Sequence, residues 1–197
     1  MAVIHRTTMS PGKLELLASW LPAQPWYTGQ PGRAPELTKA GGFRLDDPEG
    51  EVGIEFMVVT DTSGGSPVTY HVPLTYRGAP LEGAERALVG TSEHGVLGRR
   101  WAYDGTQDPV LLAQLRALFR GEAVPQAQSA SDTPDPTVAV EGTDLPLDTG
   151  LTLTVIRVLR PEPPAAPDTH ARVTATWHTP DGGSARGTFA VLRRADA

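Results

Sequence analysis

The sequence predicts an α+β protein, in which a curved antiparallel sheet is packed by two helices and followed by a small antiparallel β subdomain. Three observations predict this class. Apolar residues alternate with period two over residues 52–58 and 68–76, which is typical of strands with one buried face. Helical spacing of leucines occurs over residues 10–21 and 108–121. Further short strand-like runs follow residue 137.

The first helix is predicted over residues 10–21, with the sequence SPGKLELLASWL. Ser10 is the expected N-cap and Pro11 the first helical residue, where a missing N–H costs nothing. Leucines follow at helical spacing, and Pro22 is expected to end the helix.

A meander of strands is predicted over residues 42–77, with the runs FRL, EVGIEFMVVT and VTYHVPLTY. The segments DDPEG and DTSGGS separate these runs and are typical turns. Pro73 has no N–H to donate to a neighbouring strand, so we expect an edge or a bulge there. A further hairpin is predicted over residues 86–103, turning around SEHG.

The second helix is predicted over residues 108–121, with Asp108 as N-cap, Pro109 at the first helical position and Gly121 at the C-terminal end. It would close a first domain over residues 1–121. Residues 122–136, poor in large apolar side chains, are expected to form a linker. The runs LTLTVIRVLRP, ARVTATWHT and ARGTFAVLRR predict a small β subdomain over residues 137–197.

Composition argues against several classes of function. The net charge is −6 and basic residues do not cluster, so a nucleic-acid partner is not expected. The chain has no cysteine, which removes disulfides and thiolate chemistry. The sequence has no apolar run of about 18 residues, so a membrane span is not expected, and the first residues lack a signal-peptide pattern. We therefore expect a cytoplasmic protein, and its composition suggests a GC-rich bacterial genome.

The sequence offers no clear catalytic arrangement. The five histidines are scattered without a metal-binding spacing, and the acidic residues at 46–51 surround a turn. Neither a nucleophile elbow nor a phosphate-binding glycine motif is present. We expect no catalytic, cofactor-binding or metal-binding residues, and therefore no enzymatic activity.

Five residues are the candidates for a ligand or partner surface: Trp26, Tyr27, Arg77, Arg99 and Trp101. Exposed aromatic rings would suit a saccharide, whereas buried rings would contribute about 150–250 Å² each to the core. Both alternatives stay open from the sequence.

The block WLPAQPWYTGQPG, over residues 20–32, resembles the opening signature of bacterial maltokinases. The later segments TYHVPLTYRGAPL, LVGT, YDG and DPVLLAQL follow in the order of the maltokinase N-terminal cap. The resemblance covers about residues 10–121. It departs from the family at Pro25, where a basic residue is usual, and at Gln30, where a lysine is usual.

After residue 137, LTLTVIRVLRPEPPAAPD distantly resembles the kinase strand that carries the nucleotide-contacting lysine, followed by its Glu-Pro loop. Thr154 stands in the place of that lysine, and a hydroxyl cannot pair electrostatically with ATP phosphates. The kinase C-terminal lobe is not in this sequence. The resemblance therefore implies a stand-alone cap followed by a degenerate kinase N-lobe.

This resemblance implies a non-catalytic accessory or regulatory protein beside enzymes of trehalose, maltose and α-glucan metabolism, including glycogen. The expected partner is such an enzyme. One alternative is a saccharide-binding module that uses Trp26, Tyr27 or Trp101. The other is the N-terminal part of a split sugar kinase.

Overall fold

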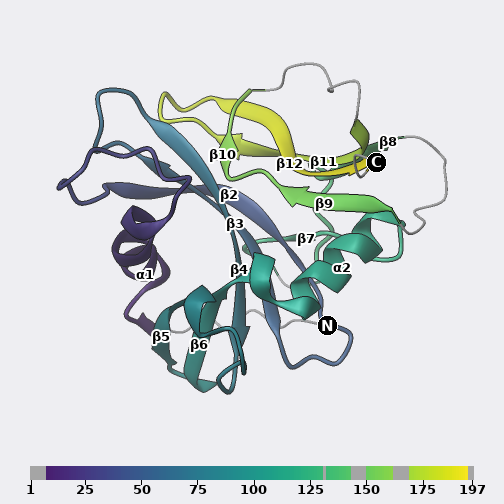
Figure 1. The fold of residues 1–197 in the computed structure, drawn as a ribbon, viewed down its shortest axis with the longest axis horizontal. Helices are drawn as coiled ribbons and strands as arrows, with labels where there is room; N and C mark the ends of the chain where they lie inside the picture. The colour runs from purple at the N-terminus through teal and green to yellow at the C-terminus, as the bar shows by residue number, and fades with distance from the viewer. Residues whose placement is uncertain (1–7, 131, 143–149, 162–168, 195–197) are drawn as a thin grey trace.

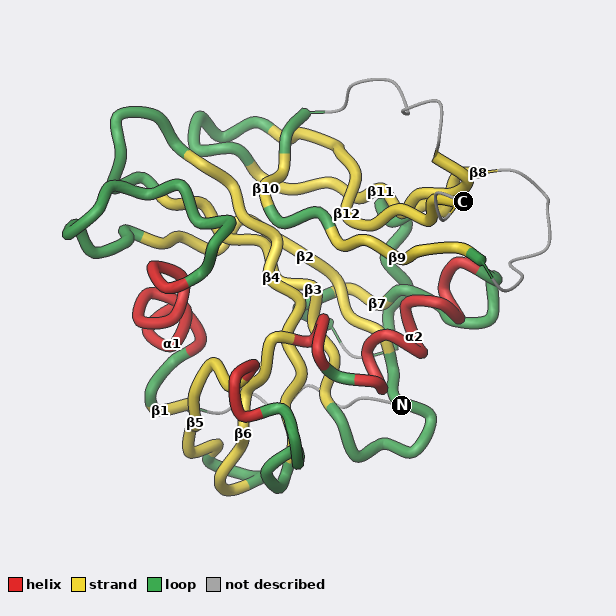
Figure 2. The backbone as a smooth tube through the Cα atoms, viewed as in Figure 1, coloured by secondary structure: helices red, strands yellow, loops and turns green. Residues whose placement is uncertain are grey.

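The computed structural model describes residues 8–130, 132–142, 150–161 and 169–194. These residues form an antiparallel sheet with two short α-helices, which confirms the α+β class (Figures 1 and 2). The strands follow the order β1-β5-β6-β4-β3-β2-β11-β12-β9, while β7, β8 and β10 add to β2, β11 and β4. No helix among the described residues has the length and hydrophobicity needed to cross a membrane.

The first half of the sheet is the predicted meander and hairpin. Its strands are β1 (Met9–Ser10), β2 (Leu37–Leu45), β3 (Gly53–Asp61), β4 (Val68–Arg77), β5 (Leu88–His94) and β6 (Gly98–Asp104). The predicted alternation in β3 and β4 is confirmed, because the apolar residues predicted to share a face in each strand do so. The predicted set from β3 and the predicted set from β4 lie on opposite faces of the sheet. One face carries Ile54, Phe56 and Val58, and the other carries Tyr70, Val72 and Leu74.

The two helices cover these opposite faces (Figure 1). Helix α1 (Lys13–Trp20) buries Leu17 against the Tyr70 face, and helix α2 (Pro109–Phe119) buries Leu111 and Leu115 against the Phe56 face. Burying a leucine stabilises the fold by about 1.5–3 kcal/mol, so each helix is held mainly by its apolar side.

The predicted start of the first helix is wrong, because α1 begins at Lys13 and not at Ser10. Ser10 belongs to β1, where it pairs with Glu93 of β5. The N-cap is Gly12, whose N–H donates to the Glu15 carboxylate at 2.6 Å. A short 3₁₀ turn, Leu21–Ala23, follows the helix.

Pro73 lies at a break in strand pairing, as its missing N–H predicts. On one side of β4 it is opposite Phe56 of β3. On the other side, β6 pairs with Leu74 onwards, and β10 (Val158–Leu159) pairs with Thr69 and Tyr70. The proline therefore occupies the gap between two strands that share one edge of β4.

The second half of the sheet is antiparallel, as predicted. Its strands are β8 (Ala139–Gly142), β9 (Leu151–Val155), β10, β11 (Thr169–His178) and β12 (Ser184–Arg194). It joins the first half where Trp177 of β11 pairs with Gly41 of β2, and again where β10 pairs with β4. Residues 162–168, within the predicted Glu-Pro loop, lie outside the described residues.

The two halves share one hydrophobic core. Phe43 stacks on Phe56 with ring centroids 4.5 Å apart, and Phe189 of β12 packs on Phe43 at 5.9 Å. The expected linker contains β7 (Gln126–Ala127), which pairs with β2. The division into residues 1–121, 122–136 and 137–197 stays a prediction.

Candidate functional site

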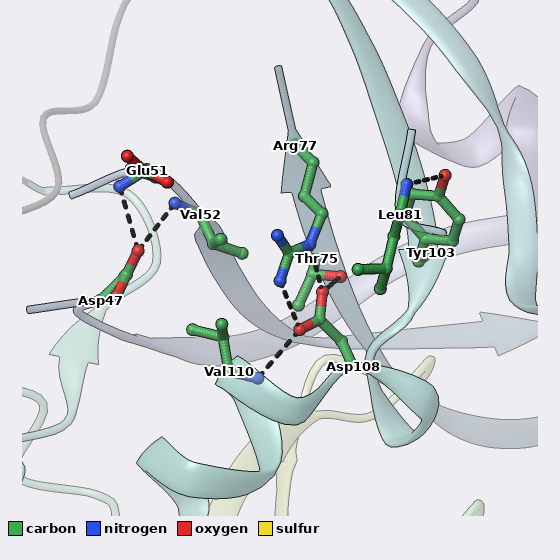
Figure 3. Close-up of polar contacts among 9 residues, drawn as sticks. All are labelled: Asp47, Glu51, Val52, Thr75, Arg77, Leu81, Tyr103, Asp108 and Val110. Carbon is green, nitrogen blue, oxygen red and sulfur yellow. Dashed lines mark hydrogen bonds and ion pairs between the residues drawn. The ribbon is translucent and has the colours of Figure 1, made fainter. Parts of the chain in front are cut away.

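The polar group at the start of α2 contains the first candidate surface residue, Arg77 (Figure 3). The Arg77 guanidinium donates to both carboxylate oxygens of Asp108, at 2.7 and 2.8 Å. Asp108 also accepts from the Thr75 hydroxyl at 2.8 Å and from the Val110 N–H at 2.9 Å. Asp108 is thus the predicted N-cap of α2, and Arg77 connects that cap to β4.

Asp108 is fully buried, and Arg77 keeps about a fifth of its side chain exposed. Burial opposes ionisation of Asp108, but the hydrogen bonds from Arg77, Thr75 and Val110 outweigh it and lower the pKa of the carboxyl group. The Asp108 carboxylate that faces Arg77 is therefore hydrogen-bonded entirely within the protein. The pair joins a strand to a helix.

Asp47, which lies beside this group, also accepts hydrogen bonds from backbone N–H groups (Figure 3). Its carboxylate accepts from the N–H groups of Glu49, Glu51 and Val52 at 3.2, 3.0 and 2.9 Å. Asp47 is buried, whereas Glu49 and Glu51 are exposed. The acidic cluster predicted at this turn therefore shapes the β2–β3 connection.

Arg99 and Trp101, two further candidates, lie on β6 of the β5–β6 hairpin. Arg99 is exposed and pairs with exposed Glu93 at 2.8 Å. Trp101 is half-buried and packs with Leu81 beside Tyr103. Exposed apolar residues at the hairpin turn are Val96 and Leu97.

Trp26 and Tyr27, the remaining candidates, lie in the aromatic cluster on the α1 side of the sheet. Trp26 packs against Trp20 and Tyr70 with centroids 5.8 and 5.9 Å away, and the Arg157 guanidinium lies 4.9 Å from the Trp26 ring centroid. Both side chains of the Trp26–Tyr27 pair are half-buried. Trp101 belongs to a different cluster, so the three rings do not form one platform.

Tyr27 is fixed at its hydroxyl as well as at its ring. The hydroxyl donates to Asp61 at 2.7 Å. Burial, followed by this bond to Asp61, raises the pKa of Tyr27 to about 12. Asp61 also accepts from the N–H groups of Glu36 and Ser63, which holds the loop before β2 against the end of β3.

The sequence reasoning did not single out Glu55, the centre of a polar cluster on the α1 face. One Glu55 oxygen accepts from Lys13 Nζ at 2.5 Å and from the Tyr76 hydroxyl at 2.8 Å, and the other accepts from Gln128 at 2.7 Å. Burial opposes ionisation of Glu55, but Lys13 and the other donors lower its pKa. Glu55 shares its face of β3 with the apolar residues Met57 and Val59, and this was the available signal.

His71 is also placed where the sequence alone could not put it. It is fully buried between Phe56 and Phe189, with ring centroids 5.9 and 4.6 Å away. Nδ1 donates to the Ile156 carbonyl at 2.9 Å, and Nε2 has no hydrogen-bond partner among the described residues. Burial lowers the pKa of His71 to about 3, although the Ile156 bond raises it.

The polar groups on these faces are used to join elements. Arg157 donates to Asp104 and to the Thr106 hydroxyl, which links the segment before β10 to the end of β6. Within the described ranges, no group of three or more His, Cys, Asp or Glu side chains is arranged to hold a metal ion.

Part of the chain matches a known protein family. Residues 20–108 match the family model described as the maltokinase N-terminal cap domain. The match ends at Asp108, so it includes both members of the Arg77–Asp108 pair. No curated protein matches the chain. Residues 20–108 of this chain are therefore similar to the maltokinase N-terminal cap domain.

Proposed function

We propose that this chain is a non-catalytic accessory or regulatory protein that works beside enzymes of trehalose, maltose or α-glucan metabolism. The observation that carries this proposal is that Arg77 and Asp108, which belong to the cap motifs, bind each other inside the protein. Arg77 and Asp108 bind each other and cap α2, and they leave no free charge pair for a substrate. The cap family match supports a maltokinase-related module.

The β5–β6 hairpin is the surface that we expect to contact an enzyme partner. It presents Val96 and Leu97, exposed by 61% and 45%, next to the exposed Arg99. Large apolar side chains at a turn are easily desolvated by a partner, and arginine is favoured at interfaces.

The test is a pull-down from the native bacterial host with the full chain as bait. We expect a trehalose, maltose or glucan enzyme to be recovered, and expect Arg99→Ala to weaken its capture. Arg33→Ala is the matched control, because Arg33 is also an exposed arginine paired with an exposed glutamate, Glu36. Recovery of no such enzyme would count against the proposal.

The saccharide-binding alternative is tested by calorimetry with maltose, trehalose and glycogen. The contacts of Trp26 with Arg157 and of Tyr27 with Asp61 occupy groups that a sugar would need. We therefore expect no heat at millimolar ligand. A saturable signal lost in Trp26→Ala would favour the saccharide-binding function instead.

A split kinase would need a cation for the phosphates from another chain. Thr154 of β9 is exposed and offers only a hydroxyl. We expect no ATP turnover by the purified chain, alone or with a candidate C-terminal lobe.

A further inference from the structure

Two arginines and a threonine converge on one carboxylate in the second half of the sheet. Glu141 of β8 is directly opposite Arg172 of β11. The apolar residues that alternate with Arg172 and Thr174 along β11 belong to the hydrophobic core, so these two side chains point to the other side of the sheet. Arg186 of β12 contacts Thr174 and completes the group.

The hydrogen bonds of this group are unevenly shared. Arg172 donates twice to one Glu141 oxygen, from Nε at 3.0 Å and from Nη2 at 2.7 Å. The other oxygen accepts from the Thr174 hydroxyl at 3.0 Å. Arg186 donates to the Thr174 oxygen at 2.5 Å and to the Thr137 carbonyl at 2.7 Å. Within the described ranges, the hydrogen bonds of Arg186 therefore go to neutral oxygen atoms alone.

The Glu141 carboxylate is too small for the donors around it. Its two oxygens are taken by Arg172 and Thr174, and the Arg186 guanidinium stays 3.9 Å away, beyond hydrogen-bond distance. Two guanidinium groups face a single carboxylate, so the group keeps a surplus positive charge. Phosphate offers more oxygens in a tetrahedral arrangement, and arginine binds it through paired N–H groups. A phosphate-type anion therefore matches both the donors and the charge better than Glu141 does.

The donors are ordered, and the carboxylate can leave them. The Arg172 side chain is 16% exposed and Thr174 is fully buried, whereas the Glu141 side chain is 41% exposed. The hydrogen bond from Arg172 lowers the pKa of Glu141, so the carboxylate is ionised at neutral pH and competes with a dissolved anion. In the part of the chain that the structure describes, β8 has four residues and pairs with β11 alone, so a small movement would turn Glu141 towards water.

We infer that Arg172, Thr174 and Arg186 form a binding site for a phosphate-type oxyanion, and that Glu141 occupies this site when the anion is absent. Binding requires the carboxylate to leave, so Glu141 weakens the affinity for the anion by competition. The site is in the second half of the sheet, whereas the β5–β6 hairpin is in the first. Anion binding and capture of an enzyme partner can therefore be tested separately.

The experiment titrates the folded full chain with inorganic phosphate at constant ionic strength and measures binding by isothermal titration calorimetry. We expect weak binding by the unmodified chain, several-fold tighter binding by Glu141→Gln, and the tightest by Glu141→Ala. The reason is that an amide competes less than a carboxylate, and a methyl group does not compete at all. Circular dichroism checks folding, and if Glu141→Ala does not fold, Glu141→Gln against the unmodified chain decides. Equal affinities in the folded variants would overturn the inference.

Glu93→Ala is the matched control, because it removes an exposed carboxylate from a single exposed arginine, Arg99, with the same change of net charge as Glu141→Ala. We expect no tighter phosphate binding in this variant. Adding Arg172→Ala or the more exposed Arg186→Ala to Glu141→Gln should remove the gain. If Glu93→Ala gains as much, or if the gain survives both arginine substitutions, phosphate responds only to net charge and the inference is wrong.

Discussion

Asp108 is the residue whose loss should damage the fold most directly. Asp108→Ala removes the α2 N-cap and leaves the Arg77 guanidinium unpaired in a mostly buried position. Breaking a buried pair typically costs about 3–5 kcal/mol, and we expect a loss of that order in urea unfolding. Arg99→Ala, which breaks the exposed Glu93 pair, should cost at most about 1 kcal/mol. Similar losses in both variants would contradict this account.

His71 should make stability depend on pH. Its pKa falls from an ordinary 6.5 to about 3 on folding, so the unfolded chain binds an extra proton between these values. Stability from the neutral His71 is fully present above about pH 6.5 and is lost as the pH falls towards 3. Between these two pH values the free energy of unfolding should fall by at most about 1.4 kcal/mol for each pH unit.

Thermal or urea unfolding between pH 7 and pH 5 tests this, because carboxylates titrate mostly below that window. The variant His71→Phe should flatten the dependence whatever its absolute stability. The control is His178→Gln, since His178 is exposed. An unchanged slope in His71→Phe would show that another group is responsible.

At the scale of elements, β10 joins the second half of the sheet to the first. The His71 N–H donates to the Arg157 carbonyl at 2.8 Å, and Val158 pairs with Tyr70. The Arg157 side chain binds Asp104 and lies over Trp26. The contacts of the Arg157 side chain thus help to hold a strand of only two residues.

Arg157→Ala should therefore release β10 while most of the sheet stays paired. We expect faster hydrogen exchange at the His71 amide, because its acceptor lies on the released segment. Amides that join β2 to β3, such as those near Phe43, serve as the internal control. If exchange rises equally at both places, the substitution destabilises the whole sheet and β10 does not open independently.

At the scale of the whole molecule, the shared core should make the chain unfold as one unit. Phe189→Ala removes a buried ring from β12 that contacts Phe43 in β2 and His71 in β4. We expect a loss of about 3–5 kcal/mol and a single transition in both near-ultraviolet and far-ultraviolet circular dichroism. Val124→Ala, at an exposed position, is the control. Two separate transitions would instead support independently folding halves.

Much of the local architecture could be predicted from the sequence, because it depends on neighbouring residues. The alternation in β3 and β4 identified which side chains share a face, and Asp108-Pro109 identified the start of α2. The predicted start of the first helix was wrong because Ser10 pairs with Glu93, a residue far away along the chain.

The candidate site was less predictable for the same reason. The sequence selected Arg77 but could not pair it with Asp108, and it did not single out Glu55. Lys13, Tyr76 and Gln128 come from three distant segments, and only folding brings them to one carboxylate. Burial of a charge is tolerable only where such donors converge, which local spacing does not reveal.

The sequence by itself determined the periodicity of the strands, the cap of α2 and the resemblance to a maltokinase cap, since each depends on short-range order along the chain. Only the tertiary structure decided that β10 and β11 complete the cap's sheet, that His71 is buried, and that Lys13, Tyr76 and Gln128 converge on Glu55. These outcomes depend on which strands pair and on what they exclude from water, and both are set by contacts between distant residues.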